Sequence, residues 1–340
     1  MIISRRLPRG PILRWGSAIV LISSSWSALL FVLYTYLDWT FLRIPFLPIS
    51  TVGTAVAFYV GFKNNAAYDR FWEGRKIWGG IVNISRTWSS SVLAYIRPGD
   101  DTDPARETRR ALIYGQLAWI NALRLQLRAT SRFHHKPAAT TKRRLSDHAD
   151  HMRNDWDTEL TPFMSEVDLR ELSKRANTAT HMLASQAQRL RNLVADERLD
   201  LFHQIDLMAQ IKEMYALQGK CERIKHTPLP RQYAEFSRIF TRVFLFLVPL
   251  GLLDVFADHV QAASTQTWTA IIPMVMASAL ISWVFFTMEG IGDSSEDPFE
   301  RSMNDVPMNA LCRTIEIDLR EMLGETDLPP KEQPADNVLY

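Results

Sequence analysis

Few residues of this chain are spaced in a way that supports chemistry, and one such group lies in a polar segment near its middle. His148 and His151 are three positions apart, with Asp147 and Asp150 beside them, and such a set of imidazoles and carboxylates can hold a metal ion. Nothing in the sequence places further ligands near them, so a solvated charged loop is the favoured interpretation. The whole stretch 142–157 is expected to be an exposed arm of unknown role.

Motifs of the common enzymes are absent from the sequence. It contains no glycine-rich phosphate loop, no Cys-x-x-Cys pair and no nucleophile elbow, and the other histidines are scattered. We therefore expect no enzymatic activity, no cofactor and no confidently assigned metal. The two cysteines, Cys221 and Cys312, are expected to be free thiols on a reducing side of a membrane.

A more informative spacing lies in an apolar stretch closer to the N-terminus. Thr54, Phe58 and Phe62 follow one another at intervals of four, which places them along one face of a helix. Gly53 and Gly61 add small surfaces that allow close helix packing. An aromatic stripe of this kind belongs more often to a core than to a pore, so periodicity alone favours packing.

The helix that carries this stripe is one of four apolar windows in a chain of 340 residues. The windows contain only three charged residues, whereas the rest of the chain is about 29% charged. Each is long enough, with its flanking turns, to cross a bilayer as a helix. The windows are residues 15–37, 44–62, 236–257 and 268–288. The sequence therefore predicts a multi-pass membrane protein, with a net charge of +2 that argues against nucleic-acid binding.

Basic residues near the ends of the windows predict the orientation of the chain. Arginines precede the first window, and Lys63 and Arg70 follow the second. The end of the third window and the loop after it contain Asp254 and Asp258 and no basic residue. Both termini and the long middle section are therefore expected to face the cytoplasm.

The middle section is predicted to be helical, because apolar residues recur at helical spacing and no alternating strand pattern persists. The fold class is therefore all-α, with four transmembrane helices and a large helical cytoplasmic region. The expected segments are a cytoplasmic N-terminal segment (1–14), a first transmembrane hairpin (15–62), a helical cytoplasmic region (63–235), a second transmembrane pair (236–288), a cytoplasmic C-terminal segment packed on the rest (289–323) and a flexible tail (324–340).

Three stretches together resemble the bestrophin family, in particular its bacterial branch. They read GFKNNAAYDRFWEGRKIWG (61–79), QGKCERIKHTPLP (218–230) and EDPFERSMNDVP (296–307), and they occur in the family's order relative to four spans. The likeness covers most of residues 12–323. It implies a homopentamer around one central pore in the bacterial inner membrane, with the lipid bilayer and permeant inorganic ions as its partners.

The resemblance also implies roles for the stripe. In bestrophins the second span lines a hydrophobic neck through three residues spaced by four, which here are Thr54, Phe58 and Phe62. Family members usually have a large apolar residue at the first position, so Thr54 is a departure that is expected to make that ring wetter. The family's cytoplasmic aperture would fall at Ile205, with Met208 as the nearest alternative, although interhelical core is an equal interpretation of Ile205.

Eukaryotic bestrophins bind calcium in an acidic clasp after a Pro-Phe pair, and this chain retains only a degenerate version. The corresponding positions are Asp297, Ser302 and Asp305, and a serine stands where a carboxylate would be needed. Because calcium takes six to eight oxygen ligands, no tight site is expected. An acidic helix cap near the membrane is the favoured alternative.

The function implied is passive passage of small inorganic ions, with chloride or another monovalent anion favoured. A channel of the same fold for a monovalent cation such as sodium is one alternative, since no charged ring in the neck fixes the sign. A membrane-anchored helical scaffold that conducts nothing is another. A secondary transporter is disfavoured because the sequence shows neither inverted repeats nor broken spans.

Overall fold

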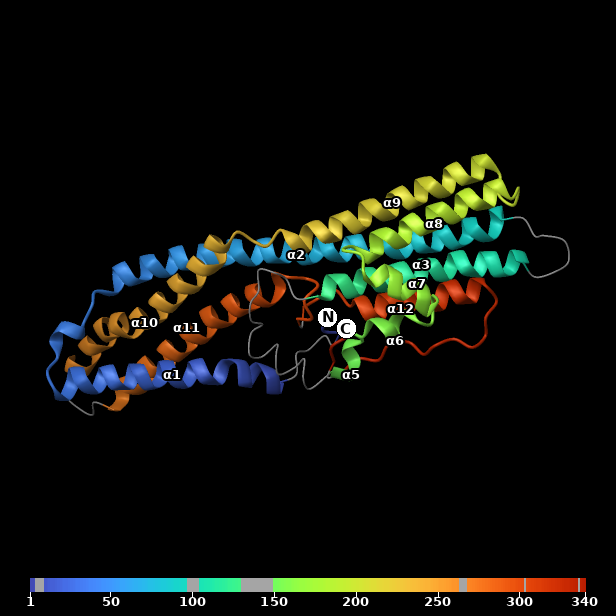
Figure 1. Cartoon of the computed structure of the whole chain (residues 1–340). Helices are drawn as coiled ribbons and strands as arrows, with labels where there is room; N and C mark the ends of the chain where they lie inside the picture. The colour runs from blue at the N-terminus through green and yellow to red at the C-terminus, as the bar shows by residue number, and fades with distance from the viewer. Residues whose placement is uncertain (4–8, 97–103, 130–148, 263–267, 303, 336) are drawn as a thin grey trace. The chain divides into compact units, whose positions relative to one another are not determined.

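The computed structural model of the chain describes residues 1–3, 9–96, 104–129, 149–262, 268–302, 304–335 and 337–340. Over these residues the regular structure is helical and no strand is formed (Figure 1). Asp147 and His148 lie outside the described residues, as does the expected arm up to residue 148. The helices are α1 (Arg9–Tyr36), η1 (Thr40–Leu42), α2 (Phe46–Tyr95), α3 (Pro104–Arg128), α5 (Ala149–Met152), α6 (Trp156–Leu160), α7 (Glu166–Ser173), α8 (Thr178–Ala195), α9 (Leu201–His226), α10 (Arg231–Ala262), α11 (Trp268–Ser295) and α12 (Met308–Met322).

The chain forms two compact units. The span unit comprises residues 4–69 and 229–296, and the bundle unit comprises residues 1–3, 70–228 and 297–340. Helix α2 belongs to both, because it continues without a break from Phe46 to Tyr95. The transmembrane hairpin expected from the sequence ends at residue 62, and the helix itself continues beyond it, because no proline follows until Pro98.

The span unit contains the helices that are long and apolar enough to cross a membrane. Four such stretches occur in the described residues, namely Gly16–Tyr36, Thr40–Tyr95, Arg231–Phe256 and Ile271–Ser295. These stretches confirm the four apolar windows predicted from the sequence, and most of them extend beyond the predicted ends. Pro249 and Pro273 lie inside α10 and α11, where a transmembrane helix tolerates proline.

Apolar contacts and small polar groups join the spans. Helix α11 packs against α1 and α10, and α1 also packs against α10. The Ser23 hydroxyl lies 2.9 Å from that of Ser278 and 2.8 Å from that of Ser282, so α1 and α11 share a buried hydrogen-bonded contact. The surrounding core includes Leu30, Phe31, Val56, Val60, Phe244, Leu253 and Met274.

The bundle unit is a packed assembly of amphipathic helices. Helix α3 packs against α8 and α12, and α8 packs against α9. Trp78 and Trp88 of α2 and Trp119 of α3 are fully buried in its core. The expected helical character of the middle section is confirmed.

A buried arginine organises one side of this core. Arg124 is fully buried, and its guanidinium donates to the carboxylate of Glu159 at 2.5 Å and to the amide oxygen of Asn309 at 2.6 Å. Arg153 donates to the same Glu159 carboxylate at 2.6 Å. Burial lowers the pKa of Arg124, and a paired carboxylate offsets the cost of enclosing its charge.

The C-terminal segment makes specific contacts, although the sequence suggests a flexible tail. The backbone N–H of Leu339 donates to the carbonyl of Met1 at 2.9 Å, and that of Ala310 donates to the carbonyl of Tyr340 at 3.0 Å. Tyr340 is buried. Residues 337–340 are therefore held on the bundle unit by backbone pairing that has no signature in the amino-acid pattern.

The two cysteines are free, as expected, and both are buried in the bundle unit. Burial raises the pKa of Cys312 to about 11 and also raises that of Cys221. Both side chains are therefore neutral thiols at physiological pH and serve as small apolar core groups.

Candidate functional site

The stripe predicted from spacing lies on an exposed face of α2 in the span unit. Phe58 is 67% exposed and Phe62 is 70% exposed, and Thr54 is exposed on the turn before them. The Thr54 hydroxyl donates to the carbonyl of Ser50 at 3.0 Å, a bond internal to the helix. The three side chains therefore project away from the chain's own core.

The opposite face of α2 fixes this orientation. Val56 and Val60 are buried in the core of the span unit. Gly53 lies so close to the ring of Phe244 that a Cβ there would come within 2.6 Å of it. Because one face is packed this tightly, α2 cannot rotate to bury Phe58 or Phe62 against its own subunit.

A buried ion-pair cluster holds α2 at the level of Phe62. Lys63 is 3% exposed, and its ammonium group donates to Glu289 at 2.5 Å and also to Asp293. Both carboxylates come from the end of α11. Arg238 of α10 pairs with Asp293 at 3.3 Å, so the cluster joins three helices of the span unit.

Close packing accompanies the cluster. The side-chain amide of Asn64 donates to the carbonyl of Met288 at 3.0 Å. A Cβ at Gly292 would come within 2.2 Å of the Asn64 side chain, so only glycine permits this approach of α11 to α2. Lys63, Asn64 and Gly292 together determine which face of α2 points outward.

Sequence reasoning does not identify this cluster, and treats Lys63 only as a basic residue that follows a span. A signal is present in retrospect. Glu289 and Asp293 are four positions apart at the end of the last span, so they lie on one helix face and suit a shared cation.

The outward stripe of α2 differs in composition from the exposed apolar face of α11. Helix α11 exposes an apolar series that suits lipid, consisting of Ile272, Met276, Leu280 and Val284. On α2, in contrast, exposed Thr51 and Thr54 precede the two phenylalanines, and exposed Asn65 and Asp69 follow them. Polar residues in line with the aromatic pair distinguish this face from one that suits lipid alone.

The expected aperture residue lies in the bundle unit. Ile205 is on the second turn of α9 and is 59% exposed, and Met208, the alternative, is 37% exposed. The turn before Ile205 exposes Phe202 as well, and the Asp200 carboxylate caps the helix by accepting from the N–H of Phe202 at 2.8 Å. The first two turns of α9 therefore expose apolar side chains on the surface of the bundle unit.

The expected clasp positions are bonded to groups of the protein. Asp297 lies 3.6 Å from the guanidinium of Arg70, and the Ser302 hydroxyl donates to the Asp305 carboxylate at 2.5 Å. Burial raises the pKa of Asp305 to about 6. In the described part of the chain, no group of three or more histidine, cysteine, aspartate or glutamate side chains is arranged to hold a metal.

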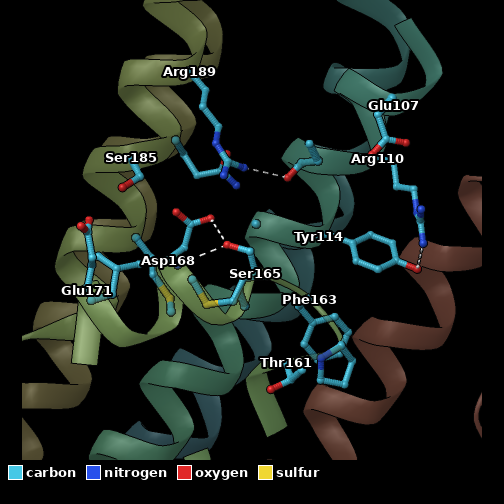
Figure 2. A pocket seen from close by; sticks show the side chains of 18 residues that line it. Glu107, Arg110, Tyr114, Thr161, Phe163, Ser165, Asp168, Glu171, Ser185 and Arg189 are labelled. Carbon is cyan, nitrogen blue, oxygen red and sulfur yellow. Dashed lines mark hydrogen bonds between the residues drawn. The ribbon is translucent and has the colours of Figure 1, made fainter. Parts of the chain in front are cut away.

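A polar hollow of about 420 Å³ lies between α3, α7 and α8 of the bundle unit (Figure 2). Several of its polar side chains bond to one another or to the backbone. The guanidinium of Arg189 donates to the carbonyl of Ala111 at 3.1 Å, and the Ser165 hydroxyl caps α7 while it donates to Asp168 at 2.8 Å. The serine therefore serves the helix end, and none of the lining residues forms a nucleophile–base pair.

Comparisons with known proteins match nearly the whole chain. Residues 6–321 match the family model described as bacterial/fungal bestrophin protein. A voltage-dependent anion channel-forming protein of Mesorhizobium japonicum, mll4386, is 31% identical over 298 residues, which cover 86% of this chain and 79% of that relative. The voltage-dependent anion channel-forming protein YneE of Escherichia coli K12 is 29% identical over 309 residues, 90% of this chain and 86% of its own.

Solved structures show the same fold. The crystal structure of a bacterial bestrophin homolog from Klebsiella pneumoniae superposes with a TM-score of 0.74 at 22% sequence identity, and the match covers 91% of this chain and 99% of that one. The all-α, four-span fold expected from the sequence is therefore confirmed.

Proposed function

This chain belongs to the bacterial and fungal bestrophin family, and on that premise we propose that it forms a homopentameric ion channel whose neck is lined by α2 of each subunit. Thr54, Phe58 and Phe62 are the neck residues, and Ile205 forms a separate cytoplasmic aperture. The channel lies in the bacterial inner membrane with both termini in the cytoplasm. This orientation places the basic residues that follow the second span on the cytoplasmic side.

One observation carries this proposal, namely the exposure of Phe58 and Phe62 on a helix whose other face is locked into the core. An exposed aromatic pair on a span needs lipid or other copies of the chain as its neighbours. The threonines, asparagine and aspartate in line with the pair favour a water-filled axis between copies over lipid.

The neck works by partial dehydration of the permeant ion. Phenylalanine rings leave the constriction apolar, and their edges offer a weak positive potential that suits an anion. Thr54 places a hydroxyl ring on one side of the constriction, which keeps that level wet. Flow is passive in this proposal, because the three neck residues are uncharged and none of them supplies a charge that would hold an ion in place.

Monovalent anions such as chloride are the proposed permeant ions. The support comes from the names of the relatives in Mesorhizobium and Escherichia, both of which describe anion channel-forming proteins. The degenerate clasp is proposed to hold no calcium tightly, because Ser302 replaces a carboxylate and buried Asp305 has a raised pKa.

Current through the purified protein in planar bilayers, with a sodium chloride gradient across the membrane, tests the proposal. The reversal potential is expected to have the sign of the chloride equilibrium potential. A reversal potential at the sodium equilibrium potential would overturn the anion assignment. Absence of current would favour the non-conducting scaffold. The native mass in detergent should correspond to a pentamer, and a stable monomer or dimer would contradict a central pore.

A further inference from the structure

The face of α2 that carries the neck residues continues to an acidic side chain. Asp69 follows Phe62 by seven positions, and a heptad returns to the same helix face to within about 20°. At about 1.5 Å per residue, its carboxylate lies about 10 Å further along the helix than Phe62. Asp69 is exposed, as are Phe58 and Phe62.

Two basic side chains at this end of the span unit, Lys63 and Arg238, are already paired. Lys63 follows Phe62 directly, but it is buried and bonded to Glu289 and Asp293. Arg238 pairs with Asp293 and also with Glu235 at 3.2 Å. In this cluster the acidic groups outnumber the basic ones, so it contributes no free positive charge to the α2 face.

Asp69 differs from those carboxylates. It makes no ion pair or hydrogen bond within the described part of the chain, although its neighbours on α2 do. Arg242 is exposed on α10 rather than on α2, one turn beyond Arg238. The charge nearest Phe62 on the neck face of the helix is therefore a negative one.

We propose that Asp69 sets the ion preference of the channel at the Phe62 end of the neck, where one carboxylate from each subunit forms a ring that lowers anion entry and concentrates monovalent cations. This inference rests on the proposed pore. The carboxylate ring would make the channel less anion-selective than the same channel without these charges. It would also make the selectivity depend on the salt concentration.

Screening gives the proposal its quantitative form. The Debye length is about 30 Å at 0.01 M, about 10 Å at 0.1 M and about 3 Å at 1 M. A ring about 10 Å from Phe62 therefore acts strongly on ions in the neck at low salt and hardly at all at 1 M. The next charged side chains on this face are Glu73, about 16 Å from Phe62 and paired with Arg223, and Lys76, at about 21 Å. Both lie beyond the Debye length of about 10 Å at 0.1 M.

The test compares the wild type with Asp69→Asn, which removes the charge and keeps the size. Asp38→Asn is the matched control, because Asp38 is exposed in the span unit and precedes α2 at the other end of the span. Reversal potentials are measured for all three proteins in tenfold sodium chloride gradients, one series near 0.01 M and one near 1 M. These concentrations bracket the screening range.

At low salt, Asp69→Asn is expected to raise the chloride-to-sodium permeability ratio severalfold, while Asp38→Asn matches the wild type. At 1 M the three proteins should agree. The wild type should itself become more anion-selective as the salt concentration rises, as should Asp38→Asn. This comparison keeps the proposal testable if Asp69→Asn folds poorly.

Equal reversal potentials for the wild type and Asp69→Asn at low salt would overturn the role of Asp69 and leave the proposed channel standing. A difference that persists at 1 M would also overturn it, because the cause would be structural rather than electrostatic. A wild type that assembles but carries no current would instead overturn the proposed function.

Discussion

Helix α2 carries large aromatic side chains in both units, but two of those in the bundle unit are fully buried and two of those in the span unit are exposed. In the bundle unit Trp78 and Trp88 are fully buried, and the indole N–H of Trp88 donates to the carbonyl of Leu112 at 3.4 Å. In the span unit Phe58 and Phe62 are 67% and 70% exposed. One continuous helix thus has aromatic side chains that its own chain buries and others that its own chain leaves exposed.

The difference separates residues that stabilise the subunit from residues that act outside it. A tryptophan enclosed by its own chain contributes to the free energy of folding through area burial and packing. An exposed phenylalanine on a span contributes little until another molecule, whether lipid, ion or subunit, meets it. The energetic cost of truncating each residue should therefore differ sharply along α2.

Substitution of the two kinds of aromatic residue should give the largest contrast. Trp88→Ala is expected to lower the free energy of unfolding by about 3–5 kcal/mol, because it leaves a cavity in a packed core. Phe58→Ala should lower it by less than about 1 kcal/mol. Thermal unfolding of both variants in the same detergent measures the contrast, and equal costs would show that Phe58 is a structural residue.

The buried charges offer a second contrast, of a somewhat smaller size. Lys63→Met should destabilise the span unit by about 3 kcal/mol, because two carboxylates lose their common cation. Arg170→Met is the control: its pair with Glu166 is exposed on both sides, and its loss should cost less than about 1 kcal/mol.

A double variant tests whether the effect of Lys63 comes from its partners. Lys63→Met combined with Glu289→Met should be more stable than Lys63→Met alone, because one uncompensated carboxylate has been removed. Chemical unfolding curves of the four proteins of this cycle give the coupling energy. Strictly additive costs would show that the ion pair contributes nothing.

The bundle unit should show a smaller, pH-dependent effect at Asp305. Burial raises its pKa from the ordinary 3.8 to about 6, so the folded state holds the proton more tightly than the unfolded state. The resulting stabilisation is complete below about pH 3.8 and is lost as the pH rises through about 6. It amounts to at most about 3 kcal/mol, since one pKa unit corresponds to about 1.4 kcal/mol.

Asp305→Asn removes that dependence. The unfolding free energy of the wild type relative to Asp305→Asn should fall between pH 4 and pH 7, as measured by unfolding at a series of pH values. A constant difference across this window, or one that rises with pH, would contradict the raised pKa.

Sequence patterns predict the four spans and the stripe well, because both are local. Charge-free windows and an interval of four depend only on neighbours along the chain, and Thr54, Phe58 and Phe62 do share one exposed face. Sequence patterns place Lys63 among the basic residues that follow the second span. The structure adds that its ammonium group is buried between two carboxylates.

The partners themselves were beyond the reach of sequence reasoning. Glu289 is 226 positions from Lys63, and periodicity along one helix contains no information about which distant residue faces it. The same holds for the backbone pairing of Leu339 with Met1, which fixes the C-terminal segment without any side-chain signature. Long-range register is the physical information that these patterns lack.

The most direct test of the central claim is the single-channel conductance of the variant Phe58→Ala/Phe62→Ala. Phe286→Ala is the matched control, because Phe286 is also exposed on a span but lies on α11. If Phe58 and Phe62 form the neck, the double variant should conduct severalfold more than the wild type, and Phe286→Ala should equal the wild type. An unchanged conductance in the double variant, with its assembly intact, would contradict the assignment of the neck to α2.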